Sequence, residues 1–147
     1  MAKKIYEACR RLLTTCANCQ PDENILIVTD TDSLEIGMAL WDAAEEFPKK
    51  TMVMMEPRKM HGEEPTPLVA AAMLKADVIF RATKFSLSHS HARRDACAAG
   101  ARDLNCCDYS IEMLEKGGLY TDFEADRKYV DQLLKSRSEE RRVGKEC

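Results

Sequence analysis

The sequence has 147 residues, of which 45% are hydrophobic and 32% are charged, and its formal net charge is −3. This composition is typical of one folded domain and argues against a disordered chain, while the interspersed charges disfavour a basic face for nucleic acid. No apolar run approaches the ~20 residues of a membrane-spanning helix, and the N-terminus lacks the apolar core of a signal peptide. We therefore expect a cytoplasmic protein without a nucleic-acid or membrane partner, whose seven cysteines are reduced.

Helical and strand patterns alternate from the N-terminus onward. Apolar residues at three- and four-residue steps predict a helix over 3–16. The continuous run Ile25-Leu26-Ile27-Val28 is typical of a strand buried on both faces of a parallel sheet. A helix over 34–46 and a strand over 51–55 follow.

The second half of the chain continues the same alternation. Thr66 is a candidate helix cap, Pro67 suits a first helical turn, and Gly100 suits the left-handed end of a helix. The other elements that we expect are a helix up to residue 74, a strand over 77–82, a helix over 92–99, a short strand over 102–105 and helices near 110–116 and 123–135. This order predicts an α/β fold, namely a Rossmann-like, doubly wound, mostly parallel sheet of about four strands with flanking helices.

The last twelve residues differ from the rest. Residues 136–147 contain one aliphatic residue, Val143, and cannot bury a face. Their ending RSEERRVGKEC resembles a spurious segment, translated from adapter or vector sequence, that is found on many unrelated proteins; the alternative is a solvated natural tail. We therefore divide the chain into an N-terminal α/β domain, 1–135, and a non-native or disordered tail, 136–147.

Polar residues follow the first predicted strand in the segment 29–33. In open α/β sheets, ligands bind outside the carboxyl ends of the strands. The carboxylates of Asp30 and Asp32 could bind a metal or an amine there; alternatively, Asp32 or Ser33 caps the next helix. The segment lacks the glycines of a dinucleotide or Walker-type phosphate site.

Hydroxyls, histidines and arginines gather after the third predicted strand, in the segment 83–94. The amides of the following helix, together with Arg93, could hold an anion or a carboxylate. Alternatively, Ser88 or Ser90 caps that helix and the two histidines bond neighbouring loops. The candidate substrate-binding or interface residues are Thr83, Ser86, His89 and Arg93.

No catalytic or metal-ligating residue is assigned. The pairs Cys16/Cys19 and Cys106/Cys107 lie about ninety residues apart, unlike the spacing of a zinc knuckle. A serine nucleophile elbow is also missing from the sequence.

The segment 83–102 carries a family resemblance. Its pattern is Thr83-x-x-Ser86-Leu87-x-His89-Ser90-x-Ala92-Arg93, followed by Ala96 and Gly100-Ala101-Arg102. With the strand 25–30, Glu56-Pro57-Arg58 and Glu64-Pro65, it resembles the N-terminal domain of the aminopeptidase T (leucyl aminopeptidase) family of metallopeptidases. Ring-cleaving dihydroxypyridine dioxygenases are relatives of that family, and the resemblance covers about residues 5–135.

The resemblance implies a two-domain enzyme whose metal ligands lie in a C-terminal half that this sequence does not match. The full-length enzyme would use zinc, cobalt or manganese to remove N-terminal residues from peptides; the alternatives are an iron dioxygenase and a stand-alone binding module. The fragment itself would bind no cofactor and be inactive. Its implied partners are the missing catalytic domain and, in a homodimer, a second copy.

Overall fold

The computed structural model describes residues 3–143, with side chains described as far as Arg137. The elements in chain order are α1 (Lys3–Arg11), a π-helical turn (Leu12–Cys16), β1 (Ile25–Asp30), α2 (Leu34–Ala43), β2 (Lys50–Met55), α3 (Pro67–Met73), β3 (Val78–Ala82), α4 (His91–Ala98), β4 (Arg102–Asn105), α5 (Ile111–Lys116), a 3-10 turn (Gly118–Tyr120) and α6 (Phe123–Val143).

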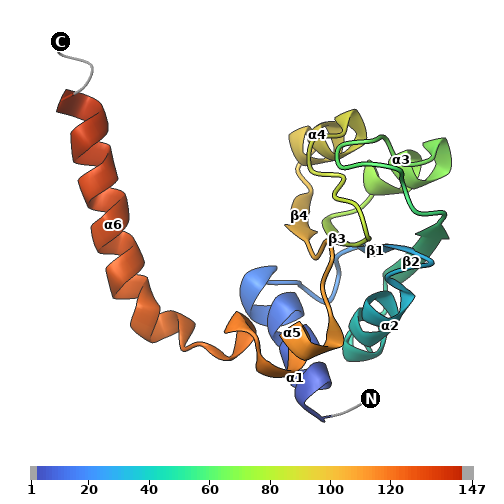
Figure 1. Ribbon diagram of the computed structural model, residues 1–147, viewed down its shortest axis with the longest axis horizontal. Helices are drawn as coiled ribbons and strands as arrows, with labels where there is room; N and C mark the ends of the chain where they lie inside the picture. Colours follow the sequence, from blue (N-terminus) through green and yellow to red (C-terminus); the bar gives the residue numbers. More distant parts are fainter. Residues whose placement is uncertain (1–2, 144–147) are drawn as a thin grey trace.

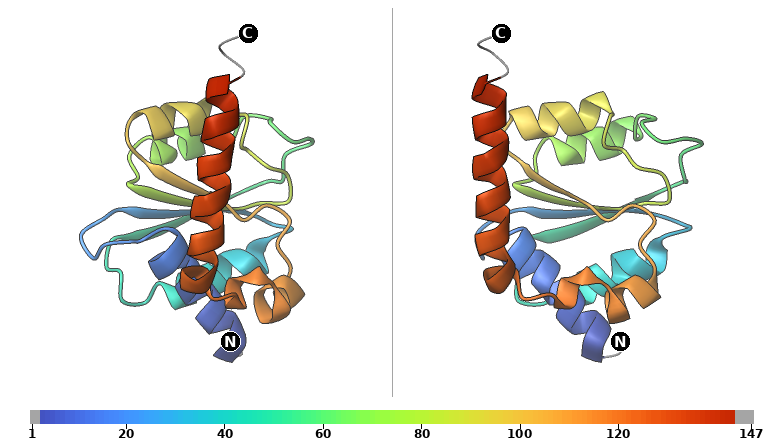
Figure 2. Two further views of the ribbon diagram at one scale, coloured as in Figure 1. Left: turned by 90° about the vertical axis from the view of Figure 1, so that its left-hand side faces the viewer. Right: turned by 60° about the vertical axis from the view of Figure 1, so that its left-hand side comes forward.

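The four strands form one parallel sheet in the order β2-β1-β3-β4. Helices α1, α2 and α5 cover one face, and α3 and α4 cover the other, so that the body has three layers (Figures 1 and 2). The predicted Rossmann-like fold is confirmed. The order reverses between β1 and β3, which places the switch point of the sheet at the carboxyl ends of these two strands.

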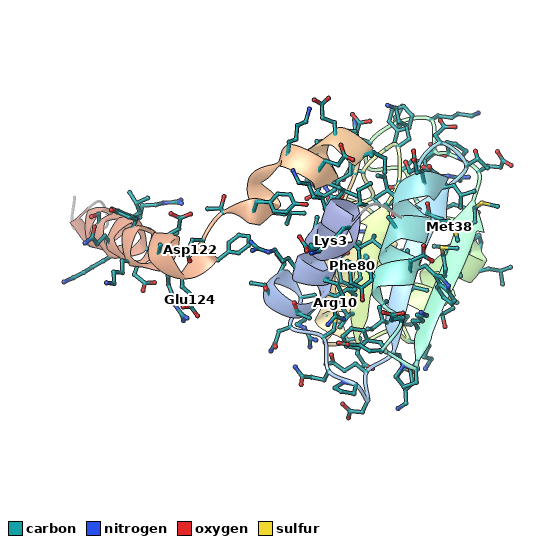
Figure 3. The ribbon with its side chains drawn as sticks, turned by 90° about the horizontal axis from the view of Figure 1, so that it is seen from below. Lys3, Arg10, Met38, Phe80, Asp122 and Glu124 are labelled. Atoms are coloured by element: carbon teal, nitrogen blue, oxygen red, sulfur yellow. The ribbon has the colours of Figure 1, made fainter. Side chains whose placement is uncertain are left out.

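Two cores hold the layers together, one on each face of the sheet. Ile25, Ile27 and Phe80 point towards α1 and α2, and Phe80 lies inside the body in Figure 3. Leu26 and Ile79 point towards α3 and α4. Because successive side chains of a strand alternate between faces, the unbroken apolar run of β1 supplies both cores.

Helix α2 crosses β1 at very close range. A Cβ atom built on Gly37 would lie 2.8 Å from the Oγ1 atom of Thr29. Any larger residue at position 37 would push the helix off the strand. Glycine is therefore required for this packing distance, although it is a poor helix former.

The helix ends differ from the sequence expectations at several points. The first helix widens into a π-helical turn from Leu12, and α2 ends at Ala43. Gly100, at φ +110°, ends α4 as predicted. Ser33 and Thr66 occupy N-cap positions. Both lie in the described part of the chain, and neither side chain accepts the hydrogen bond of a helix cap. For Ser33 the reason is its φ of −117° and ψ of 13°, which differ from the extended conformation of a capping residue.

Helix α6 leaves the α/β body at Phe123 and continues to Val143, past the predicted end at residue 135 (Figure 1). Asp122 and Glu124 mark its start outside the body in Figure 3. The helix passes position 135 because serine, glutamate and arginine are tolerated in helices. The domain boundary at 135 stays a prediction, and residues 144–147 of the expected tail lie outside the described part.

Candidate functional site at the carboxyl ends of the strands

Asp30 joins the two loops at the switch point of the sheet. Its buried carboxylate accepts hydrogen bonds from the backbone N–H of Ser33 at 2.9 Å and of Lys84 at 2.7 Å. The first bond closes the turn after β1, and the second reaches the loop after β3. Asp30 therefore fixes the relative position of these loops, and both of its oxygen atoms are engaged.

An exposed ion pair lies beside Asp30. The Nζ atom of Lys84 is 2.7 Å from the Oδ1 atom of Asp108, which follows β4. This hydrogen bond raises the pKa of Lys84 and lowers the pKa of Asp108. Cys107 donates its thiol to the Lys84 carbonyl, and burial raises the pKa of that thiol, so it is not activated as a nucleophile.

The loop after β2 also reaches this end of the sheet. The Nδ1 atom of His61 accepts the backbone N–H of Ser86 at 3.0 Å, and its ring lies edge-on to Phe85. Gly62, at φ +85°, donates its N–H to the Ser86 carbonyl at 2.7 Å. Because Nδ1 accepts, the neutral imidazole carries its proton on Nε2.

The N-terminus of α4 already holds a carboxylate. Glu64 accepts the backbone N–H of His91 at 2.5 Å and of Ala92 at 3.2 Å, and its Oε1 atom lies 2.8 Å from the His91 ring. The bonds from these amides lower the pKa of Glu64. Ser90 caps the helix by accepting the N–H of Arg93 at 3.2 Å, which confirms one of the alternative readings. The predicted anion-binding amides are thus occupied by the chain's own Glu64.

A buried ion pair lies beneath the loop after β3. Arg81 donates to both oxygens of Asp103, at 2.6 and 2.7 Å, and to the Ser88 hydroxyl at 3.2 Å. The side chains of Arg81 and Asp103 are each 2% exposed. Arg93 joins from α4, with its Nε atom 3.0 Å from Asp103. The interaction with Asp103 raises the pKa of Arg93 and directs its guanidinium into the fold.

The four candidate residues therefore occupy different environments. Thr83 is buried and donates its hydroxyl to the Phe85 carbonyl. The Ser86 hydroxyl lies 2.8 Å from that of Ser88, His89 is exposed, and Arg93 is paired with Asp103. All four belong to one loop and the helix that follows it, and their role in binding stays a prediction.

Sequence reasoning missed three participants: Arg81, His61 and Glu64. A signal existed for Arg81, because a charged residue inside an apolar strand must find a partner. The sequence carried no signal that the loop of His61 and Glu64 meets the loop after β3. The two loops meet because the order of the strands in the sheet brings the ends of β2 and β3 to the same side of the body.

An apolar cavity of about 360 Å³ lies away from this site, between the π-helical turn, β4 and α5. Leu12, Leu104, Met113 and Leu119 contribute to its lining, as do the thiols of Cys16 and Cys106. Burial raises the pKa of Cys106 to about 12, so its thiol is protonated at neutral pH. The cavity can accept apolar groups but offers no charged anchor.

The described side chains contain no group of three or more His, Cys, Asp or Glu residues arranged to hold a metal ion. Within the same part of the chain, no helix is both long and apolar enough to cross a membrane.

Comparisons with known proteins identify a fold relative. The fold resembles that of a dioxygenase. The solved structure of 2,5-dihydroxypyridine dioxygenase from Pseudomonas putida KT2440 superposes with a TM-score of 0.61 and 12% sequence identity. The match covers 74% of this chain but 36% of the dioxygenase chain, so this chain corresponds to about a third of that protein. No protein-family model and no curated protein matches the sequence.

Proposed function

We propose that this chain is the N-terminal Rossmann-like domain of a two-domain, metal-dependent enzyme. The observation that carries the proposal is the likeness to a dioxygenase over 74% of this chain and only 36% of the other. In the proposed enzyme, the metal ligands lie in the second domain, and the loops at the carboxyl ends of β1, β3 and β4 face that domain or the substrate.

The arrangement of the loops supports this role. The Lys84–Asp108 pair and His61 form a polar surface at the switch point, where α/β sheets bind their ligands, and the buried Asp30 holds the loop of Lys84 in place. The charges are held by contacts within the chain, so the surface is fixed in shape before anything binds. A prearranged surface lowers the cost of ordering side chains on association.

Helix α6 supports the same proposal independently. Tyr129, Val130 and Leu133 are 50–68% exposed on a helix that leaves the body. Exposed apolar side chains that cluster in this way are typical of surfaces covered by another part of a protein. In the proposed enzyme the second domain packs against this stripe.

Two chemistries fit the proposed enzyme. A ring-cleaving iron dioxygenase is favoured by the structural likeness, and a leucyl aminopeptidase by the sequence pattern over 83–102. An aminopeptidase metal would lower the pKa of a bound water, whereas a dioxygenase would hold iron with two histidines and a carboxylate. This chain would contribute the loop after β3 to the wall of the substrate site. His89 and Ser86 would face the substrate, while the buried Thr83 and the Asp103-bound Arg93 would hold the loop in place.

The test begins with the natural coding sequence downstream of codon 135. The complete protein is assayed on 2,5-dihydroxypyridine with Fe²⁺ and oxygen, and on leucyl p-nitroanilide with Zn²⁺, Co²⁺ or Mn²⁺. We expect one of these activities in the complete protein and neither in the 147-residue chain. Turnover by the 147-residue chain that EDTA abolishes and that survives repurification contradicts the proposal. A natural stop codon near position 135 would instead identify a stand-alone module.

A further inference from the structure

The two edges of the sheet are protected unequally. Within residues 3–143, β2 and β4 each pair with a single strand, so each has one open side. Edge β4 is four residues long and contains Arg102 and Asp103, which discourage pairing with another strand. Edge β2 is six residues long and has only Lys50 as a charge in Lys-Thr-Met-Val-Met-Met. Short, charged edges are the usual protection of a sheet, and β2 lacks it.

The backbone groups that face outward from β2 can be identified. Ile25 of β1 donates its N–H to the Lys49 carbonyl, so position 49 faces β1. Because a strand alternates the direction of its backbone groups, Lys50, Met52 and Met54 face outward. None of the three is a proline, so each offers an N–H and a carbonyl at the open edge.

We propose that this open edge pairs with β2 of a second copy of the chain, antiparallel about a twofold axis at Val53. In this register Met52 of one copy lies opposite Met54 of the other, and Lys50 lies opposite Glu56. The two Met52–Met54 pairs exchange about four backbone hydrogen bonds. The two four-stranded sheets then form one continuous sheet. The inference concerns assembly and does not depend on the proposed metal chemistry.

Charge complementarity selects this register. A twofold axis at Met52 instead would place Lys50 opposite Met54 and Pro48 opposite Glu56, where the proline has no N–H to donate. With the axis at Val53, an opposite charge meets Lys50 at both ends of the strand pair. The Nζ atom of Lys50 already donates to the Trp41 carbonyl at 3.1 Å, so Glu56 of the second copy would join this contact as the partner of opposite charge. The Glu56 carboxylate forms no ion pair with any described side chain of its own copy. The backbone carbonyl of Glu56 already accepts a hydrogen bond from Arg58 at 3.0 Å. Glu56 therefore meets Lys50 of the other copy through its side chain and not through its backbone.

Apolar side chains flank the open edge on the side of α2. Met54 is 56% exposed, Met38 of α2 is 41% exposed, and Leu34 lies one turn before it. Met38 lies on the side of the body away from α6 in Figure 3. Methionines adapt to irregular apolar contacts, so the Met52–Met54 pairs and Met38 can close over the strand junction.

The first experiment measures the mass of the full chain by sedimentation equilibrium. We expect a dimer for the wild type and a monomer for Met52→Pro. Proline at position 52 removes an N–H that faces away from β1, so the fold should persist, and circular dichroism checks this. Tyr129→Lys on α6 is the matched control and should stay dimeric. A monomeric wild type, or a dimer that Tyr129→Lys abolishes, overturns the proposal.

The second experiment reverses the charges. Lys50→Glu and Glu56→Lys should each weaken dimerisation, because like charges then meet across the axis. The double variant restores opposite charges and should dimerise again. Failure of the double variant to recover, while its circular dichroism matches the wild type, contradicts the register.

The third experiment tests the position of the axis by oxidation. At a non-hydrogen-bonded antiparallel pair the two Cα atoms are about 4.5 Å apart, within the range that a disulfide spans. Val53→Cys should therefore form a covalent dimer. Thr51→Cys should not, because the axis separates the two copies of residue 51 by roughly 13 Å along the strands. Equal cross-linking of both variants overturns the proposal; the wild type, whose Cys16 is exposed, gives the background level.

Discussion

Replacing Asp103 by Asn should cost the domain a large part of its stability. Arg81 donates two hydrogen bonds to Asp103 at 2.6 and 2.7 Å, and both side chains are 2% exposed. Among the described atoms, the Nη1 atom of Arg81 already lacks a partner. Asparagine can accept only one of the two bonds and carries no charge, so Arg81 remains as a buried, uncompensated cation.

The expected magnitude follows from the burial of the pair. Breaking a buried ion pair by neutralising one partner costs about 3–5 kcal/mol. We expect about 3 kcal/mol, because Asn retains one hydrogen bond and Arg93, which is 39% exposed, can turn to water. This loss lowers the midpoint of thermal unfolding by about 6–12 °C.

Urea unfolding followed by circular dichroism measures the loss. Asp95→Asn is the matched control, because its ion pair with Arg94 is exposed, and it should change the stability by less than about 0.5 kcal/mol. The double variant Arg81→Met with Asp103→Leu removes both charges and should recover most of the lost stability. A loss below about 1 kcal/mol for Asp103→Asn would refute the reasoning.

Three further outcomes are expected, each measured by urea unfolding. Gly37→Ala should destabilise the fold by about 1–3 kcal/mol because its Cβ would lie 2.8 Å from the Thr29 hydroxyl oxygen, and unchanged stability would contradict the close packing. Glu64 has a pKa below its usual 4.5 when folded, so its contribution is present above that value and lost as the pH falls through the folded pKa. Glu64→Gln should therefore flatten the acid side of the stability profile, and an unchanged slope would count against the helix contact. Deletion of 136–147 should change the stability by less than about 0.5 kcal/mol, whereas a clear loss would show that the segment belongs to the fold.

The sequence predicted the sheet because its strands are locally distinct. The run 25–28 is apolar on both faces, and the patterns at 51–55 and 77–82 follow helices with clear starts. Even the short strand β4 was predicted, although Arg102 and Asp103 give it no apolar pattern. The patterns of β1, β2 and β3 depend on neighbouring residues, so a single sequence reveals them.

The site was predicted less completely, because its contacts join distant segments. The loop of His61 and Glu64 meets the loop of Ser86 and His91 only after β1 has been placed between β2 and β3. From the sequence, Asp30 was a candidate ligand for a metal or an amine at one strand end. Its bond to Lys84 requires the neighbouring strand, and no local pattern encodes that neighbour.

The strand order also determines when, during synthesis, each strand can pair with its neighbours. Ile25 pairs with Lys50 on one side and with Val78 on the other, so β1 emerges from the ribosome long before its second neighbour exists. At about 5–20 residues per second, the roughly fifty residues between β1 and β3 take about 3–10 s to synthesise. During that interval the uncharged run 25–28 has an open edge in the middle of the future sheet, and such segments are prone to aggregation. Helices α1 and α2 can shield one face of β1 in the meantime, which makes early docking of these helices a protection for the growing chain.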